Sequence, residues 1–93
     1  MRTPYQKGYH FEKRVIAHWS EQGWHCFRSA GSKGCADIIA CKAGEVAAIQ
    51  CQVDKYFAPS KRQALLEFCR ENGFEAWLAW RESKKLQMEE IGP

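Results

Sequence analysis

The sequence predicts an α/β fold in which helices flank one mixed β-sheet. Three observations lead to this prediction. A helical pattern opens the chain, three short strand patterns follow it, and a second helical pattern separates the third strand from the fourth. That second helix makes the connection long enough for the strands on either side of it to pair in parallel. No linker, internal repeat or low-complexity segment divides the chain, so we expect residues 1–93 to form a single domain.

The first half of the predicted domain is one helix and three strands. Residues 1–7 are expected to form a polar arm, because Pro4 disfavours an early helix. Apolar residues repeat at positions 11, 15 and 19, which predicts a helix over residues 8–22 that ends at Gly23. Strand patterns follow at 24–28, 36–42 and 45–52, with a loop of small residues at 29–34 and a tight turn at 43–44.

The second half is predicted to contain one helix and two strands. Ser60 and Gln63 have the spacing of a capping box, which predicts a helix that begins at Ser60 and covers residues 60–72. Asn72 and Gly73 then form a typical helix end. Further strands are predicted at 74–80 and, as an edge strand, at 85–91.

Composition and charge exclude several classes of protein. A chain that is 45% hydrophobic and 27% charged is typical of a folded domain, and no apolar run approaches the roughly 20 residues that cross a bilayer. We therefore expect no membrane partner. The net charge of +3 points weakly to a polyanionic partner. Five cysteines without any CxxC pair predict reduced thiols in an intracellular, cytoplasmic protein, rather than a disulfide framework or a zinc site.

Polar side chains gather where the predicted sheet should bury apolar ones. Asp37 opens the strand at 36–42, and Gln50 and Gln52 share one face of the neighbouring strand in the hairpin. We expect Glu12 to join them from a helix packed over that same face. Carboxylates with neighbouring amide oxygens suit a hard cation such as Mg²⁺, which supports in-line attack on a phosphodiester.

These motifs, in this order, resemble the PD-(D/E)xK nuclease superfamily. Within it, the chain is most similar to the archaeal-type Holliday junction resolvases (Hjc), which also occur in viruses. The similarity covers nearly the whole chain. No single segment is specific by itself, but the order and spacing of the segments together are. It implies a restriction-endonuclease-like core with the order αβββαβ(β). The matching segments are Gly8-x-x-x-Glu12, Arg28-Ser29-x-Gly31-Ser32-Lys33-Gly34-x-x-Asp37-Ile38-Ile39-Ala40, Ile49-Gln50-Cys51-Gln52 and the strand at 74–80.

The resemblance also implies a role for each polar residue. Asp37 matches the central metal-binding aspartate, and Glu12 matches the helix carboxylate that completes the metal shell. Gln50 matches the Glu or Gln that gives a side-chain oxygen to the metal. Ser32 matches a loop serine near the scissile phosphate, and Gln52 stands at the position of the catalytic lysine. Resolvases of this type are twofold-symmetric homodimers that cut two opposed strands of a four-way junction with Mg²⁺ or Mn²⁺.

Gln52 is a departure from the family's pattern. A neutral amide cannot stabilise charge on the phosphate as a lysine does, and losing such a preorganised group typically costs about 10²–10³ in rate. The chain is therefore inactivated by engineering, or takes its lysine from elsewhere, or binds junctions without cutting them. Of the lysines nearest in sequence, Lys55 can approach from a loop, whereas Lys42 lies at the far end of its strand from Asp37.

Basic residues near this predicted site are expected to contact the phosphate backbone without reading sequence. The residues expected to bind DNA are Arg2, Lys7, Arg28, Ser32, Lys33, Lys55, Lys61 and Arg62. Lys13, Arg14, Lys84 and Lys85 are expected to be solvated surface or outer contacts. The sequence thus predicts a metal-dependent endonuclease that cleaves branched DNA. The alternatives are a non-catalytic module of the same fold that binds branched DNA, and another DNA endonuclease of the superfamily.

Overall fold

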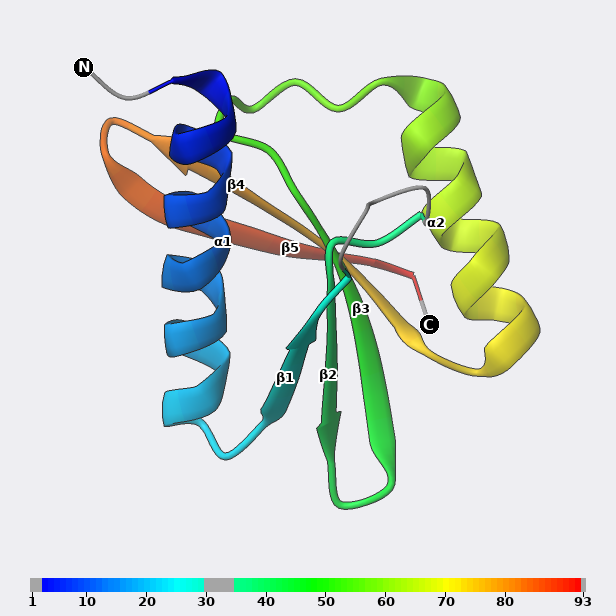
Figure 1. Cartoon of the computed structure of the whole chain (residues 1–93). Helices are drawn as coiled ribbons and strands as arrows, with labels where there is room; N and C mark the ends of the chain where they lie inside the picture. The colour runs from blue at the N-terminus through cyan, green and yellow to red at the C-terminus, as the bar shows by residue number, and fades with distance from the viewer. Residues whose placement is uncertain (1–2, 30–34, 93) are drawn as a thin grey trace.

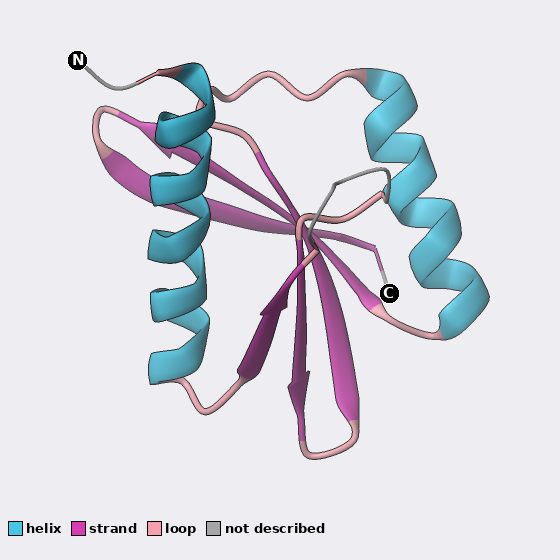
Figure 2. Ribbon diagram, viewed as in Figure 1, coloured by secondary structure: helices cyan, strands magenta, loops and turns pink. Residues whose placement is uncertain are grey.

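A computed structural model describes residues 3–29 and 35–92, and in it a five-stranded sheet lies between two helices (Figures 1 and 2). The strands follow the order β1-β2-β3-β4-β5 across the sheet. Only β3 and β4 pair in parallel, and α2 connects them, so the predicted mixed sheet with a helical crossover is confirmed. The elements are α1 (Pro4–Glu21), β1 (His25–Arg28), β2 (Ile38–Lys42), β3 (Glu45–Cys51), α2 (Pro59–Asn72), β4 (Glu75–Glu82) and β5 (Lys85–Gly92).

Helix α1 begins earlier than the sequence predicted. Thr3 is its N-cap: the Thr3 hydroxyl accepts a hydrogen bond from the Gln6 backbone, and the Gln6 side chain accepts one from the Thr3 backbone. Pro4 is therefore the first residue of the helix, where its fixed φ fits and its missing N–H costs nothing. The prediction of a polar arm over residues 1–7 is wrong for residues 4–7, and Lys7 belongs to α1.

Helix α2 also begins with a proline. Its N-cap position is Ala58, which makes no side-chain capping bond, and Pro59 starts the helix. The predicted capping box of Ser60 and Gln63 is wrong, since Gln63 donates instead to Glu67 one turn later. The predicted end of the helix is confirmed, because Gly73 adopts the left-handed conformation with a φ of 71°.

Each helix covers one face of the sheet with its own apolar core (Figure 1). On one face, Phe11, Val15 and Trp19 of α1 pack against β-strand residues such as Ile38 and Ile49. On the other face, Leu65 and Cys69 of α2 pack with small residues of β3 and β4 and with Ala36. Trp77 packs against the first core and Trp80 against the second, because the two residues have opposite parity along β4.

The β2–β3 hairpin fixes which side chains share a face. Its turn has positive φ at Ala43 (50°) and Gly44 (84°), the geometry that matches the twist of two paired strands. In the resulting register Ile38 pairs with Ile49, and both face α1. Gln50, one residue on, therefore points to the face that α2 covers. All five cysteines are free thiols, and Cys51 and Cys69 are buried.

Candidate active site

Asp37 lies just before β2 and extends the pairing of that strand with β3. Its backbone N–H donates to the Ile49 carbonyl at 2.9 Å, and its own carbonyl accepts from the Ser29 N–H at 2.8 Å. Its side chain takes part as well, since Asp37 Oδ2 accepts a hydrogen bond from the Cys51 N–H at 2.9 Å. One carboxylate oxygen is thus fixed by the backbone of β3, while Oδ1 makes no hydrogen bond within the described residues.

The electrostatic environment of Asp37 comes from both helix layers. Burial raises the pKa of the Asp37 carboxyl above its ordinary value, and the Cys51 N–H partly opposes that rise. The nearby negative charge of Glu12 raises the pKa further, whereas the positive charges of Lys61 and Arg28 lower it. Asp37 is therefore a half-buried acid, and a positive charge placed beside it would stabilise its ionised form.

Glu12 reaches this region from α1 and is held by Arg28. The two side chains form an ion pair, with Arg28 Nε donating to Glu12 Oε1 at 2.8 Å. The Arg28 guanidinium also lies over the Tyr9 ring, 4.7 Å from its centroid. The Glu12 side chain is 19% exposed, in agreement with the prediction that Glu12 lies at the edge of the buried stripe.

The expectation that α1 covers the face of the two glutamines is wrong. The core against α1 contains Ile49 and Cys51, so Gln50 points to the opposite face. Glu12 and Gln50 therefore belong to different faces of the sheet. The negative charge of Glu12 nevertheless raises the pKa of both the Asp37 carboxyl and the Cys51 thiol.

Gln50 is the one buried polar residue in the described part of the chain, with 8% of its surface exposed. The regular β2–β3 pairing begins at Ile38, and the described hydrogen bonds of Asp37 to β3 go to Ile49 and Cys51. Gln52 follows the end of β3, and its backbone N–H donates to the Ala79 carbonyl at 2.9 Å. That Gln50 and Gln52 join Asp37 in one site therefore stays a prediction.

The lysines named from the sequence do not approach Asp37. Lys55 forms an exposed ion pair with Glu82 at 3.7 Å, and Lys42 donates to the Gln22 carbonyl at 2.7 Å, at the other end of β2. Lys61 is the lysine whose charge acts on the Asp37 carboxyl.

The packing of the buried stripe of α2 determines where Lys61 lies. It lies in the first turn of the helix, one turn before Leu65 and two turns before Cys69, both of which are fully buried against the sheet. The same stripe packs against Ala36, the neighbour of Asp37. The four-residue spacing of Lys61, Leu65 and Cys69 was the sequence signal that could have identified this lysine.

The residues around Asp37 fit a small divalent cation. In the described residues, no group of three or more His, Cys, Asp or Glu side chains is arranged to hold a metal by itself. Mg²⁺ does not require such a group, because it usually keeps several waters and takes one or two carboxylates together with substrate phosphates. Asp37 and Glu12 are two carboxylates whose mutual repulsion a cation would relieve, and Gln50 is a buried amide on β3, the strand to which Asp37 bonds.

The residues predicted to bind DNA are distributed over three parts of the molecule. Arg28 and Lys61 lie near Asp37, and Lys7 lies on α1. Lys55 and Arg62 line a hollow over β4 together with Tyr56, Phe57, Trp80 and others. Arg2, Ser32 and Lys33 are outside the described residues. Arg14, predicted to be solvated surface or an outer contact, is exposed and lines a pocket beside α1.

The element order and the mixed five-stranded sheet with its flanking helices define an α/β fold of the restriction-endonuclease type. Residues 3–92 match the model of the archaeal Holliday junction resolvase (Hjc) family, and the chain belongs to that family. Nucleases of this family generally depend on a divalent metal ion. None of the described helices is long and apolar enough to span a membrane.

Two relatives illustrate the similarity. The "Crossover junction endodeoxyribonuclease Hjc" of Methanocaldococcus jannaschii is 34% identical over 83 residues, which is 85% of this chain. The chain spans 62% of the length of that relative. The solved structure of Archaeoglobus fulgidus Hjc, described as a Holliday junction resolvase, matches with a TM-score of 0.77 and 24% identity, over 90% of this chain and 72% of the other. The latter match supports the fold.

Proposed function

We propose that this chain is a divalent-metal-dependent endonuclease that cuts four-way DNA junctions as a homodimer, inside the cell. Membership of the resolvase family supports the class of reaction. The observation that carries the proposal is the environment of Asp37. This carboxylate is half-buried, and the charges of Glu12 and Lys61 both shift its pKa. A structural acid is more often paired directly with one cation, whereas Asp37 forms no ion pair within the described residues.

The proposed ligands of Mg²⁺ or Mn²⁺ are Asp37, Glu12 and Gln50. When bound, such a cation supplies charge neutralisation at the phosphate and activation of water. The chain's own contribution is to orient the ligands. The Cys51 N–H holds Asp37 Oδ2 in place, and Arg28 holds Glu12. Arg28 also brings a positive charge to the site, which suits a phosphate that approaches Asp37.

We assign to Lys61 the electrostatic role that Gln52 cannot perform. The support is its position one turn before Leu65, which packs with Ala36, together with the action of its charge on Asp37. A lysine here can stabilise the negative charge that develops on the phosphate, an effect worth about 10²–10³ in rate for one preorganised group. In this arrangement Lys61 of α2 supplies the positive side-chain charge, and Gln52 keeps its neutral amide after β3.

The substrate assignment rests on charge and on symmetry. Arg28, Lys61 and Arg62 would contact phosphates without reading bases, as a structure-selective enzyme requires. Arg2, Ser32 and Lys33 remain predicted contacts from the sequence. A twofold dimer would present two such sites to two opposed strands of a junction.

The test is cleavage of an end-labelled four-way junction in Mg²⁺ or Mn²⁺, with a flap and a linear duplex of the same sequence alongside. We expect the unaltered chain to cut the junction in preference to the duplex, and Asp37→Asn to cut neither. Equal cutting of all three substrates would favour another endonuclease activity of this fold.

A non-catalytic junction-binding role is the second candidate, and the neutral Gln52 is the observation that favours it. In that case the unaltered chain and the Gln52→Lys variant would both bind the junction without cutting it. Cleavage by either protein would reject this alternative.

A further inference from the structure

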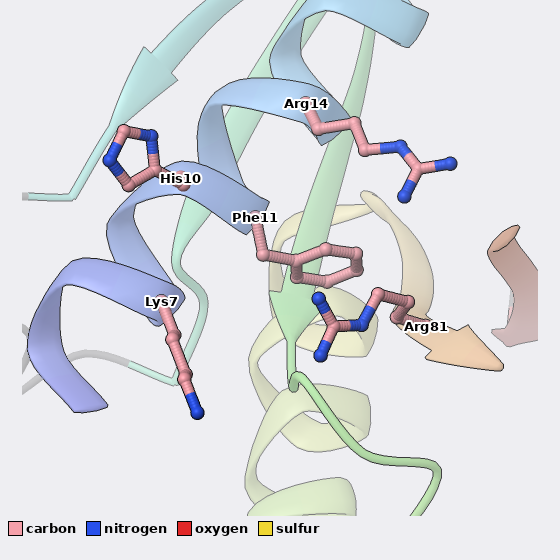
Figure 3. Close-up of a pocket in the computed structure, with 5 residues that line it drawn as sticks. All are labelled: Lys7, His10, Phe11, Arg14 and Arg81. Carbon is pink, nitrogen blue, oxygen red and sulfur yellow. The ribbon is translucent and has the colours of Figure 1, made fainter. Parts of the chain in front are cut away.

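A small pocket beside the first half of α1 is lined by basic residues (Figure 3). Its volume is about 170 Å³, and its described lining is Lys7, His10, Phe11, Arg14 and Arg81. Lys7, Phe11 and Arg14 follow one flank of α1 at helical spacing, and Arg81 comes from the end of β4. In Figure 3 the charged ends of Lys7, Arg81 and Arg14 follow one another past the Phe11 ring, while His10 projects elsewhere.

Within residues 3–29 and 35–92, the three cations in this pocket have no acidic partner. No Asp or Glu is among the described residues that line it. The two ion pairs in the described chain, Arg28–Glu12 and Lys55–Glu82, do not involve it. Like charges held together without a counter-ion repel one another, so an anion placed between them would be favoured. Structural surface charges are usually mixed in sign, which makes this arrangement unusual for a purely solvated face.

Two of the cations are held in position by the backbone. Arg14 Nη1 donates to the Lys84 carbonyl at 2.9 Å, which ties α1 to the turn between β4 and β5. Arg81 lies in β4, and its N–H donates to the Val53 carbonyl at 3.3 Å. Because only one N–H group of the Arg14 guanidinium donates to Lys84, the others remain available to a ligand.

The size and chemistry of the pocket point to a phosphate group. A volume of about 170 Å³ is smaller than the roughly 300–1,000 Å³ of a typical small-molecule site, so a nucleotide or a cofactor would not fit. Arginine forks and a lysine ammonium are the groups that bind phosphate oxygens, by paired hydrogen bonds and by charge respectively. A phosphate within a longer chain would fit because only the phosphate needs to enter.

The pocket lies across α1 from the Asp37 region. Tyr9 and Glu12 contact Arg28 on one flank of the helix, whereas Lys7 and Arg14 occupy the other. A helix with its side chains is about 10–12 Å across. At about 3.4 Å of rise per nucleotide, this width corresponds to roughly three or four nucleotides. One DNA strand could therefore reach both flanks of α1.

We propose that Lys7, Arg14 and Arg81 form a binding site for a phosphodiester of the DNA backbone, a few nucleotides from the phosphate at Asp37. The identification of the polyanion as DNA rests on the proposed function. The site itself rests on the pocket and on its uncompensated charge. This proposal makes Arg14 and Arg81 contacts to DNA. Neither residue was among those that the sequence predicted to bind DNA near Asp37.

The test is the salt dependence of junction binding by Arg81→Ala, measured without divalent metal so that no cleavage occurs. Arg70→Ala is the matched control, since Arg70 is an exposed arginine in the last turn of the other helix. We expect Arg81→Ala to weaken binding about 10-fold at low salt, as for the loss of one charged hydrogen bond. Its slope of log K against log [salt] should fall by about 1, while Arg70→Ala leaves both unchanged. Arg81→Lys should retain most of the slope.

The outcomes separate this site from the proposed function. If Arg81→Ala binds the junction with the affinity and slope of the unaltered chain, the phosphate site is overturned, whether or not the protein cuts DNA. If the slope falls as expected but no substrate is cut in Mg²⁺, the site stands and the catalytic proposal fails. A further titration uses inorganic phosphate at constant ionic strength. Displacement of the junction by millimolar phosphate from the unaltered chain but not from Arg81→Ala would show that a DNA phosphate occupies this site. Arg81-dependent binding of phosphate that leaves junction affinity unchanged would identify a free-anion site and overturn the assignment to DNA.

Discussion

The region around Asp37 and the pocket beside Phe11 lie on opposite flanks of α1, and their charges are held in different ways. Asp37 and Glu12 are partly buried, and Gln50 is buried. Lys7, Arg14 and Arg81 are exposed. Charges in a partly buried site act strongly on one another and on a reacting group, whereas exposed charges are screened by salt. The first region is therefore suited to chemistry and the second to binding, and changes in the two should have separable effects.

The largest expected effect is the loss of cleavage in Asp37→Asn. The amide keeps the shape of the side chain and can still accept from the Cys51 N–H, but it removes the charge that would hold the cation. We expect the single-turnover rate on a four-way junction to fall at least about 10²–10³-fold, with junction affinity nearly unchanged. Asp54→Asn, at an exposed acid in the loop after β3, is the matched control and should cut at the normal rate.

Glu12→Gln should weaken metal binding without abolishing the reaction. The glutamine oxygen can still accept from Arg28, so α1 keeps its contact with β1, but one negative charge leaves the site. Changes of this kind near a metal cost about 10–100-fold in metal affinity. The Mg²⁺ concentration for half-maximal cleavage should rise by that factor, and calorimetry should show the same shift in binding. No shift in either measurement would place Glu12 outside the metal site.

A change in the pocket should alter affinity alone. In Arg81→Ala we expect the protein concentration for half-saturation to rise about 10-fold, because one charged hydrogen bond is lost. The single-turnover rate at saturating protein should stay within about twofold of that of the unaltered chain. A large fall in that saturated rate would mean that the two flanks of α1 are not functionally separate.

The smallest effect concerns stability. The pKa of Asp37 is raised in the folded state, mainly by burial, so the folded protein binds that proton more tightly than the unfolded chain does. The resulting stability is present at low pH and is lost as the pH rises through the raised pKa. Asp37→Asn should therefore raise Tm at pH 7 and in the absence of metal, with a smaller gain near pH 4. In a domain of this size each 1 kcal/mol corresponds to about 4–8 °C. A lower Tm at pH 7 would show that the charged form of Asp37 stabilises the fold.

Most of the fold was predictable because the elements carry local signals. Apolar spacing marked both helices, and the Ala43-Gly44 turn fixed the register of the β2–β3 hairpin. The helix starts were predicted wrongly in both cases, at Pro4 and at Pro59. Proline is unfavourable inside a helix and favourable at its first position, so its meaning depends on where the N-cap lies, which sequence alone left open.

The candidate site was predicted in part, and the missing part depends on tertiary packing. Local alternation was enough to predict the β2–β3 hairpin, in which Asp37 bonds to Ile49 and Cys51 of β3, and the approach of Gln50 to Asp37 stays a prediction. Which helix covers which face was not locally determined, and α1 was assigned to the wrong face. Lys61 was predicted as a DNA contact but not as the replacement for the catalytic lysine, because the effect of its charge on Asp37 depends on how α2 packs on Ala36. The pocket at Arg81 joins residues far apart in the sequence, so no motif could reveal it.

The most direct test of the central claim is a double-mutant cycle of Lys61 and Gln52, measured as single-turnover cleavage of a four-way junction in Mg²⁺. We expect Lys61→Gln to lower the rate about 10²–10³-fold, and Gln52→Lys in that background to restore most of it. Lys55→Gln is the matched control and should be neutral, since Lys55 pairs with Glu82. If Lys61→Gln cuts as fast as the unaltered chain, or if Gln52→Lys gives no recovery, then Lys61 does not supply the missing cation to the Asp37 site.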